Sequence, residues 1–253
     1  MLPEQDQTVF DWIRTGRHAL PRTRTPDWTE NFVSHLIPPV FESYAKLLHN
    51  IRAHYEFIDE PLSPSENAIL GIASCEPLRS FVESRRARGN RIRWKELADL
   101  LNVPFAPAIN HEWYRKKLDD AWCWPRLFYG PSDGHLTEDE CQRLASTLKS
   151  VDGNEECFFR FSDIPFYAPA NSASPQLFRG MLDRVYNVQK EKRLSFEYWW
   201  PTNRSWCVCS DYDLAFTIIG GGRKLISTIL MDELLECIEV TPQTRIDSLA
   251  PMP

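Results

Sequence analysis

The first half of the chain places its hydrophobic residues at helical spacing. The clearest stripe follows Pro39 at i, i+1, i+4, i+7, i+8 and i+11 and consists of Val40, Phe41, Tyr44, Leu47, Leu48 and Ile51. Residues at this spacing share one face of a helix, and proline suits the first turn, so the pattern predicts a helix over 39–51. Similar reasoning predicts helices over 63–72, 94–101 and 110–119, and a helix that begins at the capping box Thr137 to Glu140.

Beyond residue 155 the pattern becomes strand-like. Short runs rich in aromatic and β-branched residues predict strands over 157–161, 196–200, 205–210, 213–219 and 237–240. Residues 201–203 are expected to form the turn between the second and third of these. The alternating apolar residues from Trp206 to Ile218 would also fit one long strand, but Asp211 and Asp213 favour a turn at 210–213 that divides it. Helices are expected over 177–188 and directly after Gly220 to Gly222. The first two dozen residues predict an irregular arm.

These elements together predict an α+β fold. The N-terminal half is expected to be mostly helical, and the C-terminal half to hold a small antiparallel sheet with flanking helices. One domain spanning 1–253 is expected. A turn-rich joint at 130–136 would separate a mainly helical 1–130 from an α+β part, 137–253.

Composition narrows the class of protein. The 253 residues are 43% hydrophobic, enough for a core without a metal or disulfides, and the seven cysteines are odd in number and irregularly spaced. No run of about 18 apolar residues suggests a membrane span, and the polar start lacks a secretory pattern. The formal net charge of −6 disfavours general nucleic-acid or membrane binding. A cytoplasmic protein without cofactor or metal is expected.

The most unusual stretch is the aromatic block 196–222, and its chemistry argues against an enzyme. Cys207 and Cys209 have no histidine near them in sequence, and the glycines at 220–222 lack a phosphate-loop spacing. Asp211 and Asp213 could form a carboxylate pair that holds a cation, or a turn in which they cap backbone amides. No catalytic residue is predicted, and a metal-dependent hydrolase at Asp211 and Asp213 stays an alternative.

Nucleic-acid binding is another alternative, and it rests on a basic run at residues 85–95. Six cations fall within eleven residues, namely Arg85, Arg86, Arg88, Arg91, Arg93 and Lys95. The helices expected over 94–101 and 110–119 follow it and resemble a helix-turn-helix, so residues 85–117 could contact DNA phosphates. Pro104 and Pro107 crowd the second helix, which favours a solvated basic face instead.

The segment YWWPTNRSWCVCSDYDLAFTIIGG resembles the C-terminal signature of a group of uncharacterised bacterial proteins, WWP…SW.C..DYDL…GG. The resemblance rests on residues 197–240, with fainter echoes in RIRWKELADLL and WPRLFYGP. It brings no established activity and no catalytic residues. Small acidic proteins of this kind are often immunity-type inhibitors that neutralise toxins, so the resemblance implies binding to another protein.

The leading hypothesis is therefore a non-enzymatic protein that binds a macromolecular partner, with DNA as the less favoured partner. An acidic surface would steer a basic toxin toward it. Tryptophan and arginine dominate interface hot spots, and the expected contact residues are Trp199, Trp200, Arg204, Asp211 and Asp213. The partner's identity and the oligomeric state do not follow from the sequence.

Overall fold

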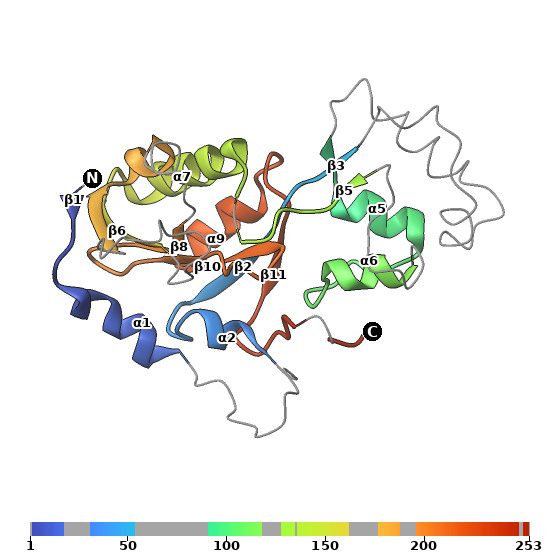
Figure 1. The fold of residues 1–253 in the computed structure, drawn as a ribbon, viewed down its shortest axis with the longest axis horizontal. Coiled ribbons are helices and arrows are strands. Elements are labelled where there is room, and N and C mark those ends of the chain that lie inside the picture. The colour runs from blue at the N-terminus through green and yellow to red at the C-terminus, as the bar shows by residue number, and fades with distance from the viewer. Residues whose placement is uncertain are drawn as a thin grey trace, which may run out of the picture. The chain divides into compact units, whose positions relative to one another are not determined.

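The computed structural model describes residues 2–17, 31–53, 91–117, 128–134, 136–161, 177–187, 196–247 and 250–252. They belong to two compact units (Figure 1). Unit 1 comprises Met1–His49 and Asp133–Arg245, and unit 2 comprises Asn50–Ser132 and Ile246–Pro253. The expectation of a single domain stays a prediction. No helix in the described part of the chain is long and apolar enough to cross a membrane.

Unit 1 is built on an antiparallel sheet that has eight strands within the described residues. In spatial order they are β1 (Leu2–Pro3), β7 (Leu177–Met181), β6 (Glu156–Phe161), β8 (Phe196–Pro201), β9 (Cys207–Cys209), β10 (Phe216–Gly221), β2 (Ser43–Leu48) and β11 (Cys237–Val240). Strand β2 pairs with β10 on one side and with the edge strand β11 on the other. Segments from both ends of the sequence therefore share one sheet.

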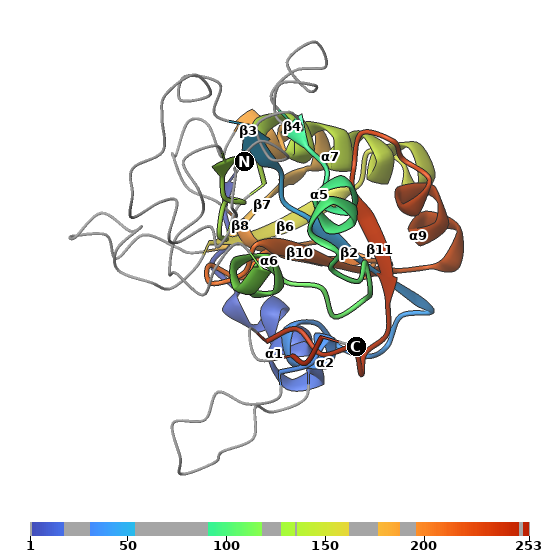
Figure 2. The same ribbon diagram turned by 90° about the vertical axis from the view of Figure 1, so that its right-hand side faces the viewer.

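Helices cover both faces of this sheet. In Figures 1 and 2, α7 (Glu138–Asp152) and α9 (Arg223–Leu230) lie on one face, and α1 (Asp11–Gly16) and α2 (Val33–Leu36) on the other. The main buried cluster joins the first pair of helices to the sheet and includes Leu144, Leu148, Trp199, Trp206, Ile219 and Ile226. This arrangement explains why the central strands are buried on both faces.

The predicted capping box at the start of α7 is confirmed. Glu140 N donates to Thr137 Oγ1 at 3.4 Å, and Thr137 N donates to Glu140 Oε2 at 2.9 Å. These bonds satisfy amides that have no partner inside a helix. Cys141, Leu144 and Leu148 then face the core, as their spacing predicts.

The helix predicted over 39–51 is wrong, because this segment forms β2 and then β3 (Ile51–Ala53). Tyr44 to Leu48 are all at most 3% exposed, so the strand is buried on both faces. Such a strand loses the alternation of polar and apolar residues that marks a half-buried one. Its apolar run therefore also fitted a helical spacing.

The predicted fold class is wrong as well. The N-terminal half is not mostly helical, and the sheet is large rather than small, since β1 and β2 are part of it. The helix predicted over 177–188 is replaced at its start by β7 and by the short 3-10 helix η4 (Leu182–Arg184). The protein is dominated by its sheets.

Unit 2 contains a sheet with strand order β4 (Arg91–Ile92), β3, β5 (Phe128–Tyr129), and the helices α5 (Trp94–Leu101) and α6 (His111–Lys117). Both helices were predicted from the sequence. Tyr114 on α6 donates its hydroxyl to Trp94 O at 2.7 Å, and Trp113 Nε1 donates to Ala250 O at 2.8 Å. The end of the chain is thus anchored on α6. The helix predicted over 63–72 lies outside the described residues.

The strands predicted near 157–161, 196–200, 205–210, 213–219 and 237–240 are confirmed as β6, β8, β9, β10 and β11, with small shifts at their ends. The helix predicted after Gly222 is α9. The turn predicted at 210–213 separates β9 from β10.

The chain leaves unit 1 at His49, whose N donates to Ala215 O, and returns at Gly134, whose N donates to Leu214 O.

Candidate functional site

The two tryptophans expected to contact a partner lie in the core. Trp199 and Trp200 are each 1% exposed. Trp199 packs in the cluster beneath α7 and α9, and Trp200 stacks on Phe158 on the opposite face with ring centroids 5.6 Å apart. A partner therefore cannot reach either ring in this structure, and both leave the list of contact residues.

The remaining three expected residues do not form one surface. Arg204 lies in the turn before β9, with a φ of 59° and its guanidinium 5.4 Å from the Trp12 ring centroid. Asp211 and Asp213 lie in the turn after β9, at the opposite end of that strand. The structure thus brings Asp211 and Asp213 together and places Arg204 at the other end of the sheet.

The cysteines of the aromatic block are packing residues. Cys207 and Cys209 are both 0% exposed. Burial raises the pKa of each thiol, because the charged thiolate loses its hydration. A nucleophilic cysteine needs the opposite shift, toward a lower pKa. This agrees with the absence of a histidine near these residues in sequence.

The Asp211 carboxylate caps the turn. Asp213 N donates to Asp211 Oδ1 at 3.1 Å, and Leu214 N donates to Asp211 O at 3.0 Å. Burial raises the pKa of Asp211. Within the described residues, no group of three or more His, Cys, Asp or Glu side chains is placed to hold a metal ion. The geometry of Asp211 therefore matches the turn interpretation.

Tyr212, between the two aspartates, is the exposed aromatic residue of this turn at 42%. A hydrogen bond to the Asp213 carboxylate raises the pKa of the Tyr212 hydroxyl, and the charge of Asp211 acts in the same direction. Gly134 packs directly against the backbone of this turn, and its N donates to Leu214 O at 2.9 Å. It adopts a φ of +70°, and a Cβ added there would lie 2.5 Å from Tyr212 Cα. Tyr212 is therefore presented on a fixed backbone between two carboxylates.

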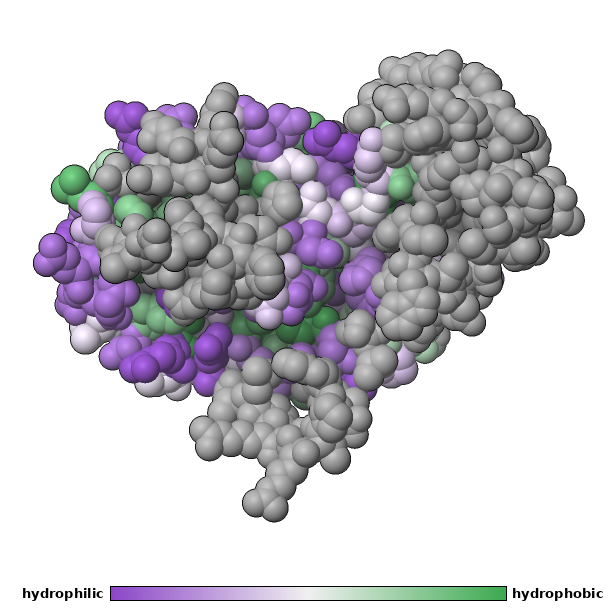
Figure 3. Space-filling view, in the orientation of Figure 1, coloured by the Kyte–Doolittle hydropathy of each residue, from purple (hydrophilic) through white to green (hydrophobic). Residues whose placement is uncertain are grey.

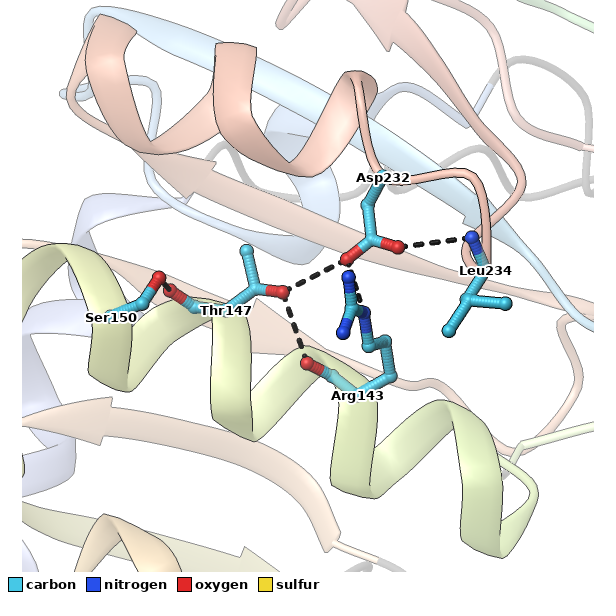
Figure 4. Close-up of polar contacts among 5 residues, drawn as sticks. All are labelled: Arg143, Thr147, Ser150, Asp232 and Leu234. Carbon is cyan, nitrogen blue, oxygen red and sulfur yellow. Dashed lines mark hydrogen bonds and ion pairs between the residues drawn. The ribbon is translucent and has the colours of Figure 1, made fainter.

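A second loop carries the most exposed large hydrophobic side chain in the described residues, Met231 at 82%, and also Leu234 at 59%. Asp232, between them, is buried and fixes the loop (Figure 4). Its carboxylate accepts hydrogen bonds from Arg143 Nε at 2.7 Å, Thr147 Oγ1 at 3.0 Å and the Leu234 amide at 3.0 Å. The apolar side chains therefore project from an anchored loop.

Strand order brings this loop and the Tyr212 turn to the same end of the sheet. Leu48 N donates to Glu236 O at 2.9 Å, while the next residue, His49, donates its N to Ala215 O at 3.1 Å. The two loops thus flank the end of β2 on either side. We call this region the acidic end and define it as Asp211, Tyr212, Asp213, Met231, Glu233 and Leu234.

The net charge of the chain resides entirely in unit 1. Of the 29 Lys and Arg and the 35 Asp and Glu, unit 2 holds 12 of each, so that unit 1 accounts for the whole formal charge of −6. Hydrophilic residues form much of the described surface of unit 1 in Figure 3, with hydrophobic areas between them. The acidic end therefore belongs to the negatively charged unit.

Sequence reasoning missed a buried chain of polar groups behind the acidic end. His49 Nε2 lies 2.9 Å from Thr217 Oγ1, which lies 2.6 Å from Ser210 Oγ. All three residues are at most 4% exposed. Their spacing in the sequence gives no signal, because β2 and β10 meet only in the fold. Since these groups are shielded from water and satisfy one another, they stabilise the end of the sheet.

The basic segment gives weaker support to DNA binding. Arg85, Arg86 and Arg88 lie outside the described residues, while Arg91, Arg93 and Lys95 lie at β4 and the start of α5. The connection between α5 and α6 comprises residues 102–110. This connection is much longer than the turn of about 3–4 residues in a helix-turn-helix. The alternative stays a prediction without that motif.

No protein-family model, curated protein or solved structure matches this chain.

Proposed function

We propose that this chain binds a basic protein in the cytoplasm through the acidic end, in the manner of an immunity-type inhibitor. The observation that carries the proposal is the convergence of two fixed loops, which together present Tyr212, Met231 and Leu234 among carboxylates. Exposed aromatic and apolar side chains on a rigid backbone give contact area at low entropic cost.

The charge of unit 1 supports a basic partner rather than nucleic acid. Carboxylates at the rim of an interface accelerate association with a positively charged protein and oppose the approach of phosphates. Asp213 and Glu233 are both exposed at the acidic end. The proposal differs from the sequence-based hypothesis in its residues, since Tyr212, Met231, Glu233 and Leu234 replace Trp199, Trp200 and Arg204.

Site-specific photocrosslinking in the producing cell tests this proposal. A photoreactive phenylalanine analogue replaces Tyr212 in one full-length variant and Thr202, which is exposed in the turn before β9, in a control variant. We expect a covalent adduct with a basic protein from position 212 and none from position 202. Adducts of equal yield at both positions, or none at 212, would overturn the proposal.

A charge-matched pair of variants tests the role of the carboxylates. Asp213→Asn and Glu239→Gln each remove one exposed negative charge, but Glu239 lies on β11, outside the acidic end. We expect Asp213→Asn to slow association with the basic protein identified by crosslinking several-fold at low salt. Glu239→Gln should have little effect on that association. Equal effects would assign the attraction to net charge rather than to this site.

Co-expression tests the immunity-type role separately. The crosslinked protein is expressed alone, with the wild-type chain, and with a Tyr212→Ala variant. Toxicity that is relieved by the wild type and not by Tyr212→Ala supports inhibition at the acidic end. If the crosslinked protein is not toxic when expressed alone, the proposed binding still stands, but the proposed inhibitor role is contradicted.

A further inference from the structure

The first 16 described residues form an arm across the face of the sheet opposite α7 and α9. The arm, residues 2–17, comprises β1, the 3-10 helix η1 (Gln7–Phe10) and α1. Beneath it, cross-strand pairing places Arg179, Phe158 and Trp200 in one row and Arg160 and Tyr198 in the next. We call these five residues the shelf. It alternates arginines with aromatic rings.

Contacts between arm and shelf are mainly aromatic. The Phe10 ring centroid lies 5.2 Å from that of Tyr198 and 5.7 Å from that of Trp200, and the Arg160 guanidinium lies 4.5 Å from the Phe10 centroid. Trp12 meets Trp200 at 6.4 Å. Arg17 Nη1 donates to the Tyr198 hydroxyl at 2.9 Å. The arm therefore uses the shelf as a platform for its two aromatic rings.

Few side chains of the arm are buried. Ile13 is its one buried residue, whereas Trp200 and Tyr198 beneath it are each 1% exposed. Leu2 and Pro3 pair with β7, the Glu4 amide donates to Leu177 O on the same strand at 2.8 Å, and Leu2 is 75% exposed. The indole Nε1 of Trp12 is buried without a hydrogen-bond partner among the described residues, which costs about 1–3 kcal/mol. The seat of the arm is thus imperfect, because release of the arm would return this N–H to water.

Charge on the arm complements the shelf. Residues 2–17 contain three carboxylates, Glu4, Asp6 and Asp11, and two arginines, Arg14 and Arg17, and all three carboxylates precede Trp12. The hydrogen bond that Arg179 donates to the Glu156 carboxylate raises the pKa of Arg179, and the charge of Glu4 on the arm acts in the same direction. The first part of the arm, residues 2–12, is therefore acidic and bears aromatic residues, and it lies on arginines and aromatic rings.

We propose that the shelf is a binding site for an acidic peptide that carries aromatic side chains, and that the arm occupies this site until such a peptide displaces it. Single-stranded nucleic acid also stacks on aromatic platforms beside cations. The shelf disfavours it, because Glu197 lies 2.7 Å from Arg160 and Glu156 is bonded to Arg179, and both carboxylates would repel a phosphate backbone. A peptide with separated carboxylates can avoid them, as the arm does.

Binding of a fluorescein-labelled peptide with the sequence of residues 2–17 to the full-length chain tests the proposal by fluorescence anisotropy. Occupation by the arm reduces the apparent affinity by the fraction of open molecules. We therefore expect the peptide to bind a Phe10→Ala/Trp12→Ala chain at least tenfold more tightly than the wild type. A peptide with the same two substitutions should not bind either chain.

Arginine variants locate the binding. In the Phe10→Ala/Trp12→Ala background, Arg179→Gln should weaken peptide binding several-fold. Arg184→Gln, which removes an exposed cation outside the shelf, should not. Circular dichroism establishes that each variant is folded. If the double variant unfolds, Arg17→Gln provides the weakened arm, because it removes the hydrogen bond to Tyr198 and a charge that acts on Asp211 but leaves both aromatic rings in place.

Three results would overturn the proposal. The first is equal affinity of the peptide for the wild type and for the folded variant with a weakened arm. The second is binding of the peptide that lacks both aromatic rings. The third is tighter binding of labelled oligo(dT) than of the arm peptide, which would assign the shelf to nucleic acid.

Discussion

Asp232 and Arg143 join the loop after α9 to α7 through a contact of 2.7 Å, although the two residues are far apart in sequence. The Asp232 side chain is 3% exposed and that of Arg143 is 46% exposed. The carboxylate also accepts from Thr147 and from the Leu234 amide. This one side chain therefore fixes the half of the acidic end that carries Met231 and Leu234.

Asp232→Asn should destabilise unit 1 by about 1–3 kcal/mol at pH 7, because hydrogen bonds to a charged group are lost. Burial acts to raise the pKa of Asp232, but the hydrogen bonds from Arg143, Leu234 and Thr147 hold it below its ordinary value. Such a group stabilises the fold above its unfolded pKa and ceases to do so as the pH falls through its folded pKa. The difference between variant and wild type in urea denaturation should therefore shrink in acid. Glu233→Gln, next to it, should change stability little, and equal losses for both would contradict the clamp.

Lys46 should make stability depend on pH in the alkaline range. Burial lowers the pKa of Lys46 from 10.5 to about 7, and its Nζ lies 4.2 Å from the Phe216 ring centroid. The unfolded chain thus retains this proton where the folded chain loses it. The free energy of unfolding should rise between pH 7 and pH 10, by up to about 1.4 kcal/mol per pH unit. Denaturation of Lys46→Met should show a flatter slope, and Lys224→Met, at an exposed site, should keep the wild-type slope. Parallel slopes for all three proteins would refute the prediction.

Gly134→Ala should move or loosen the Tyr212 turn. An alanine there would adopt a φ of +70° and bring its Cβ to 2.5 Å from Tyr212 Cα. Backbone strain of this kind costs about 1–3 kcal/mol, to which displacement of the turn adds. Gly222→Ser is the matched control, since an added Cβ there meets no atom within 4 Å and serine suits a helix N-cap. Thermal denaturation compares the two, and a loss in Gly222→Ser as large as in Gly134→Ala would count against the explanation.

Trp200→Ala should cost about 3–5 kcal/mol, because it removes a fully buried aromatic side chain. Arg204→Ala should cost less than about 1 kcal/mol, since it removes an exposed guanidinium beside Trp12. Urea denaturation measures both. The comparison separates core residues from surface residues within the aromatic block, and a mild effect of Trp200→Ala would mean that its ring is not part of the core.

Local signals in the sequence predicted those elements that begin with a cap or are rich in aromatic and β-branched residues, such as β8 and β10. Thr137 and Glu140 identify the start of α7 because capping depends on residues only three positions apart. The segment around Lys46 was predicted to be a helix because β2 is buried on both faces, a property set by distant strands, and its sequence SYAKLL has no β-branched residue. Trp199 and Trp200 were misassigned for a related reason, since α7, α9 and the arm cover them only in the fold.

The candidate site could be predicted only in part. Asp211 and Asp213 were recognised as a turn from their composition. Their proximity to Met231 and Leu234 follows from the order β10, β2, β11 in the sheet, and no spacing in the sequence reveals that order. The buried contact of His49 with Thr217 is equally non-local.

His49 and Gly134 are hydrogen-bonded to the adjacent residues Ala215 and Leu214. The chain therefore departs from the large sheet and rejoins it at nearly the same point, and the described residues between them, 50–53, 91–117 and 128–133, contribute no strand to that sheet. In topological terms, residues 50–132 are an insertion into a loop of unit 1. A short bridge from His49 to Gly134 would preserve the connectivity of all eight strands, so unit 1 has the geometry of a module that can accept or lose its insert without being rethreaded.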